Sequence, residues 1–594
     1  MPLTLSALIV AATMPALMQQ SVASVEPTEP IAAVRRPAPS LSEKDSVRAL
    51  KIARRAQSDF EVVRRRLLPI EDAQEGACDA VIGRYCYREQ MGFGPPAEAP
   101  EVIGARMRLL TVLDSLGRLL PGDRWILGQK LRYYLEEGRV STADSVAVRC
   151  AANTLVPSTV GWCLALIGYV AQERGDYARA DAAFTNALAA MPEKERCEFQ
   201  DLSILLDGRA AGQYKHATCQ ARDSLAVAFW RLVQPLYLTG VNDLRTEFLA
   251  RITRMYIERD TRTPMNGRWD SDDRETLLRF GGGQYYTQLY RPPGSTHEAA
   301  IASHRRGPAF NFVPDARSLA APNQLSLEDW EYANVAPRSG YAPAWAGSFQ
   351  PLLDNQVALF RRGDSAVVVA AFKITDKVTT SSHVKFQAGV FAAAVDSGNI
   401  QAPVGTTLNN VGSTVVSTIR ALWRPLIVSL EVMDTSGRAA GRARFAPKLP
   451  VSGTRLSLSD LLLYTPSDSA PTNLNEAIPR ALQALRVPNS RQIGLFWEAY
   501  GARPEGEAFE YSLLVQAIGR SWVHRTFIKL HITDPDRSLS VLWSEVPTVT
   551  DDIACRGVTV DLSRLKPGRY HVRLSLTGRG EAPIVSERDI EIME

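Results

Sequence analysis

Acidic side chains gather behind a tryptophan near the middle of the chain, and their spacing could support acid–base chemistry. Asp272 and Asp273 are adjacent, and Glu275 follows shortly after them. Glycoside hydrolases use paired carboxylates, one as the acid and the other as base or nucleophile. Arg274 stands among these carboxylates, however, and Ser271 followed by Asp272 also suits a capped turn whose side chains accept backbone N–H bonds. We favour the structural interpretation and nominate no catalytic residue. An extracytoplasmic hydrolase or carbohydrate-acting enzyme that uses these carboxylates is the alternative.

Other side chains that could bind a metal or activate a nucleophile form no known motif. The histidines are His216, His297, His304, His383, His524, His531 and His571, and they form neither a HExxH nor a HxH set. The sequence contains no Gly-x-Ser-x-Gly elbow, no phosphate-binding loop and no dinucleotide fingerprint. We therefore expect neither a metal nor a cofactor.

Six of the seven cysteines fall in the N-terminal half as neighbours along the sequence. This order predicts three short-range disulfides, which are typical of exported proteins. The predicted pairs are Cys78 with Cys86, Cys150 with Cys163, and Cys197 with Cys219, and Cys555 is left over. A zinc site is the rival interpretation, but no pair has the Cys-x-x-Cys spacing and the histidines lie far away.

The first residues are typical of a secretory signal peptide. An apolar run extends from Leu3 to Met18, and the small residues Ser21 to Ser24 follow it as a cleavage pattern. The run departs from the usual form because no Lys or Arg precedes it. We expect residues 1–24 to be removed and residues 25–42 to form a Pro-rich leader. No later stretch approaches the roughly 20 apolar residues of a transmembrane helix, so we expect an extracytoplasmic protein without one.

Length and composition place the chain among globular proteins of several domains. It has 594 residues, of which 45% are hydrophobic and 22% are charged. A net charge of +4 over this length creates no strong field, so a nucleic-acid partner is not implied. Oligomeric state is left open.

Two helices joined by a short turn are predicted between Trp162 and Pro192. Small residues face a large one where antiparallel helices cross, and a glycine can end the first helix. The residues in this pattern are Leu164, Gly168, Gly175, Tyr177, Ala180, Phe184, Ala187 and Pro192. The spacing resembles the tetratricopeptide (TPR) repeat, with a degenerate copy upstream from Trp125 to Val146. A generic helical hairpin is the alternative. The TPR resemblance implies stacked neighbouring helices and a groove that holds a peptide or a partner protein.

A second pattern begins after the hairpin and surrounds the carboxylates described above. Its core is Gly267, Trp269, Ser271, Asp272 and Gly281. These residues resemble the bacterial GWxTD domain, which is named for its Gly-Trp-x-Thr-Asp motif and implies a short strand before a Gly-Pro-Pro turn. Arg268 separates the Gly from the Trp, Ser271 replaces Thr, and Gly282-Gly283 replace Pro-Pro. We expect a small α+β module at residues 221–290.

Alternating apolar residues and turn signals predict strands throughout the C-terminal half. The clearest set is Val558, Val560 and Leu562, then a turn at Pro567-Gly568, then Tyr570 to Leu576. A strand is also expected at Phe527 to Ile532. Strands at this spacing predict two antiparallel sandwiches, at residues 351–464 and 491–594, separated by a linker at 465–490. The second resembles fibronectin type III or immunoglobulin-like modules.

The chain is thus expected to be multidomain, α then β. Residues 43–220 are predicted to form TPR-like helices, and residues 291–350, rich in Pro, Gly and aromatic residues, to form a connector along the body. The pattern favours an exported, non-enzymatic protein-binding or scaffolding component of the bacterial cell envelope, whose partner is a protein or peptide.

Overall fold

The structure is a computed structural model of the whole chain. It describes residues 42–71, 78, 80–82, 85–90, 95–153, 157–206, 208–265, 269, 271–289, 301–306, 311–330, 348–374, 385–396, 399–434, 439–450, 455–488, 492–503, 506–518 and 538–593. The expected signal peptide, Gly267 and the strand expected at Phe527 to Ile532 lie outside these residues. Residues 1–47 and 48–594 are separate units, and every contact described below lies within the second.

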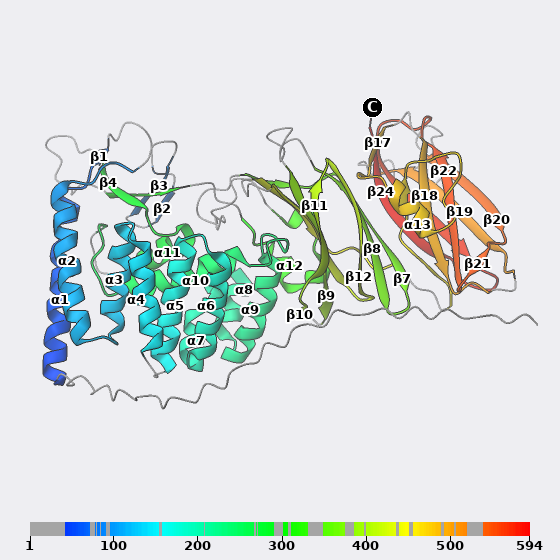
Figure 1. Cartoon of the computed structure of the whole chain (residues 1–594). Coiled ribbons are helices and arrows are strands. Elements are labelled where there is room, and N and C mark those ends of the chain that lie inside the picture. The colour runs from blue at the N-terminus through cyan, green and yellow to red at the C-terminus, as the bar shows by residue number, and fades with distance from the viewer. Residues whose placement is uncertain are drawn as a thin grey trace, which may run out of the picture. The chain divides into compact units, whose positions relative to one another are not determined.

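Helices dominate the N-terminal half, as predicted (Figure 1). They are α1 (Glu43–Arg66), α2 (Pro100–Leu119), α3 (Arg124–Glu136), α4 (Val140–Ala152), α5 (Pro157–Glu173), α6 (Tyr177–Ala190), α7 (Glu193–Phe199), α8 (Gly208–His216), α9 (Cys219–Val233), α10 (Asp243–Glu258) and α11 (Ser271–Phe280). Each of α2 to α5 packs against the next helix along the chain. One hydrophobic cluster extends from Ala53 on α1 to Leu278 on α11, so no separate core begins at residue 221.

The predicted hairpin is formed by α5 and α6. Gly175 adopts a positive φ of 74° between the two helices, and the Asp176 side chain accepts a hydrogen bond from the backbone N–H of Arg179 at 3.2 Å. A Cβ atom at Gly168 would lie 2.8 Å from the ring of Phe184, so a side chain at this position would collide with the second helix. The small residue at 168 thus permits the close approach that its spacing predicts.

A five-stranded mixed sheet joins two distant parts of the chain. Its order is β1-β4-β5-β3-β2, from β1 (Ile70–Glu71), β2 (Ala80–Ile82), β3 (Tyr85–Gln90), β4 (Tyr285–Leu289) and β5 (Ile301–Arg306). Residues 291–350 were expected to form a connector. This prediction is wrong for residues 301–306, because β5 pairs with both β3 and β4. Further along lie α12 (Ala316–Ala320) and the buried rings of Phe312 and Trp330.

The next region places two sheets over a common apolar core, which includes Leu359, Val368, Val390 and Leu430. Its strands are β6 (Ser348–Pro351), β7 (Asn355–Arg362), β8 (Ser365–Lys373), β9 (Phe386–Asp396), β10 (Asn399–Ile400), β11 (Val404–Val411), β12 (Thr414–Leu422), β13 (Leu426–Asp434) and β14 (Ala439–Phe445). One sheet has the order β10-β9-β13-β14-β6, with β11 also on β9, and the other has the order β12-β8-β7. Strands β11 and β14 were not predicted.

The C-terminal region repeats this plan around Trp497, Tyr511 and Tyr570. Its strands are β15 (Ser457–Leu458), β16 (Leu462–Tyr464), β17 (Arg486–Pro488), β18 (Gln492–Tyr500), β19 (Phe509–Ala517), β20 (Ser538–Glu545), β21 (Val549–Thr550), β22 (Ile553–Asp561), β23 (Gly568–Thr577) and β24 (Ile584–Met593). The sheet orders are β15-β18-β22-β21, with β16 on β18, and β17-β24-β23-β19-β20. The linker expected at 465–490 is wrong in part, because it contains α13 (Leu474–Ala477) and because β17 pairs with β24. Of the helices that the structure describes, none is long and apolar enough to cross a bilayer.

Candidate functional site

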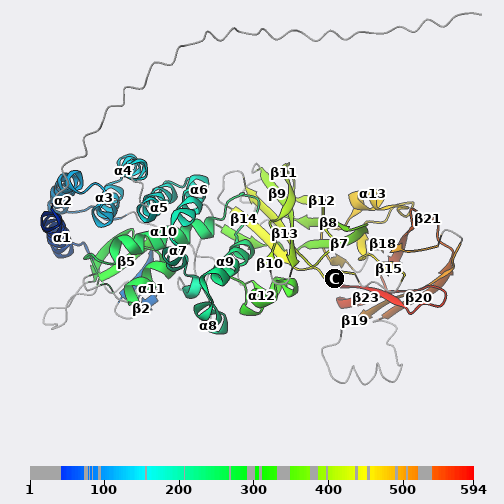
Figure 2. The same cartoon turned by 90° about the horizontal axis from the view of Figure 1, so that it is seen from below.

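Helix α10 packs against three of the earlier helices and is part of the same core. This helix packs against α3, α5 and α6 (Figure 2). The side chain of Gln129 on α3 donates to the carbonyl of Ile257 at 2.8 Å, and Gln172 on α5 donates to Glu247 at 3.1 Å. Phe248 of α10 is fully buried. These contacts make α10 part of the helical core, and the expected groove with its peptide or protein partner stays a prediction.

The GWxTD-like residues begin a helix rather than a strand. Ser271 and Asp272 form the first turn of α11, where acidic side chains interact favourably with the helix dipole. Gly281 ends this helix with a φ of 83°, and its N–H donates to the carbonyl of Leu277 at 2.9 Å. Trp269 is half-buried in front of the helix. The strand implied by the resemblance is thus absent between Ser271 and Phe280.

A small pocket of about 40 Å³ lies beside these motif residues. Trp269, Asp273 and Gly281 line it, together with Tyr286 and Glu258. A cavity needs roughly 10–15 Å³ of this kind of space to hold one water, so the pocket has room for a few water molecules. Of the three carboxylates that could act as acid and base, only Asp273 lines the pocket. Asp273 therefore shares this pocket with Glu258, which is paired with Arg254, and not with Asp272 or Glu275.

Glu258 connects the small pocket to a buried ion network between α1, α3 and α10. Arg132 lies 3.1 Å from both Glu61 and Glu136, and Arg254 lies 2.8 Å from Glu258. Tyr133 donates its hydroxyl hydrogen to Glu61 at 2.8 Å. Buried charges are tolerated only when they are paired in this way, so the network ties three helices together.

Two carboxyl groups of this network have pKa values that are shifted in opposite directions. Burial raises the pKa of Glu61, and the nearby cations Arg64 and Arg132 only partly oppose this. Burial also acts to raise the pKa of Glu136, but Arg64, Arg132 and Arg106 outweigh it and lower the value to about 2. Two carboxyl groups whose pKa values are shifted apart can mark the general acid and the general base of an active site. Here both share the same arginines, and their arrangement is that of a structural network.

The structure also assembles a Thr–His–Glu set that the sequence did not indicate. The Thr287 hydroxyl donates to Glu71 at 2.7 Å and lies 2.8 Å from Nε2 of His304. Because the single hydroxyl hydrogen goes to Glu71, His304 must donate from Nε2 and cannot act as the base for Thr287. This is the reverse of the nucleophile activation seen in catalytic triads. Only the pairing of β4 with β5 and β1 brings these residues together.

Glu71 is held in its charged form at the edge of this set. Burial acts to raise its pKa, but the hydrogen bond from Thr287 and the positive charges of His304 and Arg88 outweigh it and lower the pKa. An ionised carboxylate accepts hydrogen bonds and cannot donate them, which agrees with the direction of the Thr287 bond. The set therefore cross-links three strands.

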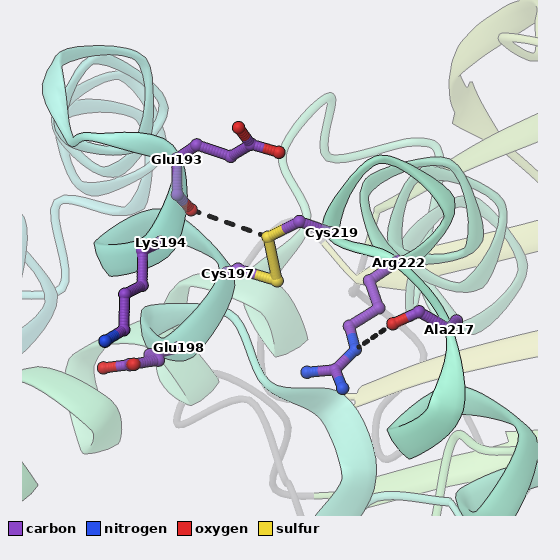
Figure 3. Close-up of a pocket in the computed structure, with 7 residues that line it drawn as sticks. All are labelled: Glu193, Lys194, Cys197, Glu198, Ala217, Cys219 and Arg222. Atoms are coloured by element: carbon purple, nitrogen blue, oxygen red, sulfur yellow. Dashed lines mark hydrogen bonds between the residues drawn. A yellow bond between two sulfur atoms is a disulfide. The ribbon is translucent and has the colours of Figure 1, made fainter.

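The three disulfides predicted from neighbouring cysteines are present. Their Cα–Cα distances are 5.3 Å for Cys78–Cys86, 5.5 Å for Cys150–Cys163 and 5.7 Å for Cys197–Cys219. The last bridges α7 to α9 and lines a pocket of about 400 Å³ (Figure 3). Cys555 is a free thiol whose pKa is raised to about 12 by burial and by Glu498, so it is a poor nucleophile. The described residues contain no group of three or more His, Cys, Asp or Glu able to hold a metal ion.

Comparisons with known proteins give no family for this chain. No protein-family model matches it, and no curated protein matches it. A solved transglutaminase of red sea bream matches 41% of this chain and 31% of its own, with 9% identity and a TM-score of 0.12. The tetra-tandem repeat in the extending region of a large adhesion protein matches 40% of this chain and 49% of its own, with 12% identity and a TM-score of 0.13. The chain thus spans less than half the length of either structure. TM-scores this low support no conclusion about its fold or function.

Proposed function

We propose that the chain is an exported, non-enzymatic protein-binding or scaffolding component of the bacterial cell envelope. The observation that carries this proposal is the set of three disulfides in the helical half. Disulfides persist in the periplasm and outside the cell, whereas cytoplasmic thiols are kept reduced. The proposal includes a TPR-like helical platform, a GWxTD-like module and two β-sandwiches as the finer description of the fold.

Buried polar contacts between successive regions support a scaffolding role. Arg444 on β14 donates to the carbonyls of Leu232 and Gln234 at 2.8 and 2.7 Å, and the N–H of Leu238 donates to Glu431 on β13 at 2.9 Å. The guanidinium of Arg444 lies 3.9 Å from the ring centroid of Tyr237. These contacts join the chain after α9 to the first β region. Junctions of this kind would let a scaffold present its modules in one fixed arrangement.

A second junction joins the two β regions. Arg362 on β7 donates two hydrogen bonds to Glu498 on β18, at 2.5 and 2.8 Å. Gln356 on β7 donates to the carbonyl of Leu463 at 3.0 Å, and Arg588 on β24 donates to the carbonyl of Val357 at 2.7 Å. Phe360 and Phe496 are buried beside these bonds. Successive modules are thus linked through side chains as well as through the chain itself.

Crosslinking in intact cell envelopes tests the binding role. The exported protein is crosslinked in place, purified under denaturing conditions and analysed by mass spectrometry. We expect a reproducible protein partner at an amount comparable to that of the protein itself. A protein that gives no partner and instead turns over an envelope substrate would contradict the proposal.

The substitution Asp272→Asn separates the scaffolding role from the hydrolase alternative. If Asp272 acts through the dipole of α11, the variant loses about 0.3–1 kcal/mol of stability, because Asn lacks the negative charge, and it keeps its partner. The hydrolase alternative requires the reverse, namely lost turnover with an unchanged melting temperature. Thermal unfolding and a substrate assay on the same preparation distinguish the two.

A further inference from the structure

A third pocket borders the buried ion network at Glu61 and is rich in arginine. Its volume is about 310 Å³, which is at the lower end of the range of small-molecule sites. Arg65 and Arg66 line it from the last turn of α1, and Arg262 lines it from the segment after α10. Basic residues at a helix C-terminus are ordinary, but Arg262 comes from a different element and contributes to the same space.

The walls of this pocket are held in place by hydrogen bonds. The Gln57 side chain donates to the carbonyl of Arg262 at 2.7 Å and accepts from its N–H at 3.1 Å, which fixes the Arg262 backbone against α1. Gln288 on β4 donates to the carbonyl of Arg65 at 2.6 Å. Three elements thus form the walls before any ligand is present, and preorganised sites bind at a lower entropic cost.

The pocket offers two kinds of binding group, namely cationic side chains and one buried hydrogen-bond acceptor. The guanidinium groups of Arg66 and Arg262 have no carboxylate within ion-pairing distance among the described residues, and guanidinium groups recognise planar anions by paired hydrogen bonds. Glu61 also lines the pocket and is only 2% exposed. Its Oε1 accepts from Arg132 and Tyr133, whereas its Oε2 is buried without a hydrogen-bond partner among the described residues. A buried acceptor without a donor is costly, so a ligand that supplies a donor is favoured.

We propose that this pocket binds the carboxy-terminal residue of a peptide or protein, with the terminal carboxylate on Arg66 and Arg262 and the last amide N–H on Glu61. The last residue of a peptide carries both an anion and a neutral donor, which are the two groups that the pocket can bind. An ammonium group suits the Glu61 position less well, because Arg64 and Arg132 already lie 3.8 and 3.1 Å from that carboxylate. Val62 in the wall suits a small aliphatic side chain. This inference rests on the proposed protein-binding function and names the part of the partner that is recognised.

Titration calorimetry of the mature full-length chain tests the inference with four small probes. These are N-acetyl-L-alanine, its carboxamide, its N-methyl derivative and inorganic phosphate. We expect N-acetyl-L-alanine to bind about tenfold or more tightly than the carboxamide, which lacks the anion, and than the N-methyl derivative, which lacks the donor. Phosphate that binds as tightly as N-acetyl-L-alanine would overturn the assignment in favour of a general anion site, and so would equal binding of the carboxamide.

Variants locate the site and provide a control. Arg262→Gln and Arg66→Gln should each weaken N-acetyl-L-alanine about tenfold, whereas Arg48→Gln, on the exposed face of the same α1, should leave it unchanged. Circular dichroism confirms that each variant is folded. Unchanged binding in the folded Arg262 and Arg66 variants overturns the site. Envelope crosslinking that still captures a protein partner would then show that this inference has failed while the scaffolding role stands.

Discussion

Gly168 is a residue on which the close packing of α5 and α6 depends directly. A Cβ atom there would lie 2.8 Å from the Phe184 ring, so Gly168→Ala forces one helix or the ring to move. Overpacking of this kind costs about 1–3 kcal/mol. We expect the variant to lower the unfolding free energy of the helical region by this amount, as measured by far-ultraviolet circular dichroism in urea.

Gly212 provides the matched control for this substitution. It lies in α8, and a Cβ atom added to it would meet nothing within 4 Å. Alanine is the better helix former by about 0.5–1 kcal/mol, so Gly212→Ala should preserve or raise stability. Equal effects of the two substitutions would contradict the packing of the hairpin described here.

The pKa of His571 provides a test of how β23 pairs with β24 in the C-terminal sheet. Its Nδ1 lies 2.7 Å from Asp589 and its Nε2 lies 3.4 Å from Glu587, both on the neighbouring strand β24. Burial acts to lower the pKa of His571, but the two carboxylates outweigh it and raise the pKa above the ordinary value of about 6.5. The stabilisation is therefore fully present below that ordinary value and is lost as pH rises through the raised one.

We expect an NMR titration of the His571 ring to show a fall in its pKa in Asp589→Asn. Glu591→Gln is the control, because Glu591 lies further along β24 opposite Arg569. The contribution to stability should be small, since the His571 side chain is 39% exposed and solvent screens the pair. An unchanged pKa in the Asp589 variant would mean that β23 and β24 are not in this register.

At the scale of elements, the junction between α9 and the first β region depends on one fully buried ion pair. Arg444 lies 2.8 Å from Glu431, and both side chains are 0% exposed. Arg444→Ala leaves Glu431 buried without its cation, which typically costs about 3–5 kcal/mol. Arg424→Ala is the control, because its pair with Asp396 is more than half exposed and should contribute only about 0–1 kcal/mol. Thermal or urea unfolding of both variants measures the difference, and similar losses would contradict a buried junction.

Helices and strands could be predicted where apolar side chains recur with a single helical or strand period. Strands β22 and β23 were found because Val560, Tyr570 and Leu574 alternate with polar residues and face a single core. Strand β14 was missed because Arg442 and Arg444, which read as surface residues, are fully buried within it. Their burial depends on carbonyl groups and aromatic rings that other elements supply. No local pattern carries that information.

Most of the candidate sites likewise depend on contacts between residues that are distant in the sequence. The disulfide pairs were predictable because each joins neighbouring cysteines. The pocket lined by Arg65, Arg262 and Gln288 was not, since it brings together residues that are far apart in the sequence. The strand expected after Trp269 followed from resemblance, whereas Leu277, Leu278 and Phe280 form the buried face of a helix there. The pairing of β5 with β3 likewise depends on tertiary structure.

At the scale of the whole molecule, helices and sheets are stabilised in different ways. Disulfides occur in the N-terminal half, where polar networks replace part of the apolar core. The two β regions each enclose an apolar core between sheets. Partner binding is proposed at the arginine-lined pocket of α1.

Intact-mass spectrometry of the protein recovered from its host is the most direct test of whether the protein is exported. The sample is alkylated at free thiols with and without prior reduction. We expect a chain shortened by its first two dozen residues, with three closed disulfides and one alkylated cysteine at Cys555. An uncleaved chain in which every cysteine is alkylated without reduction would contradict export and return cytoplasmic chemistry to consideration.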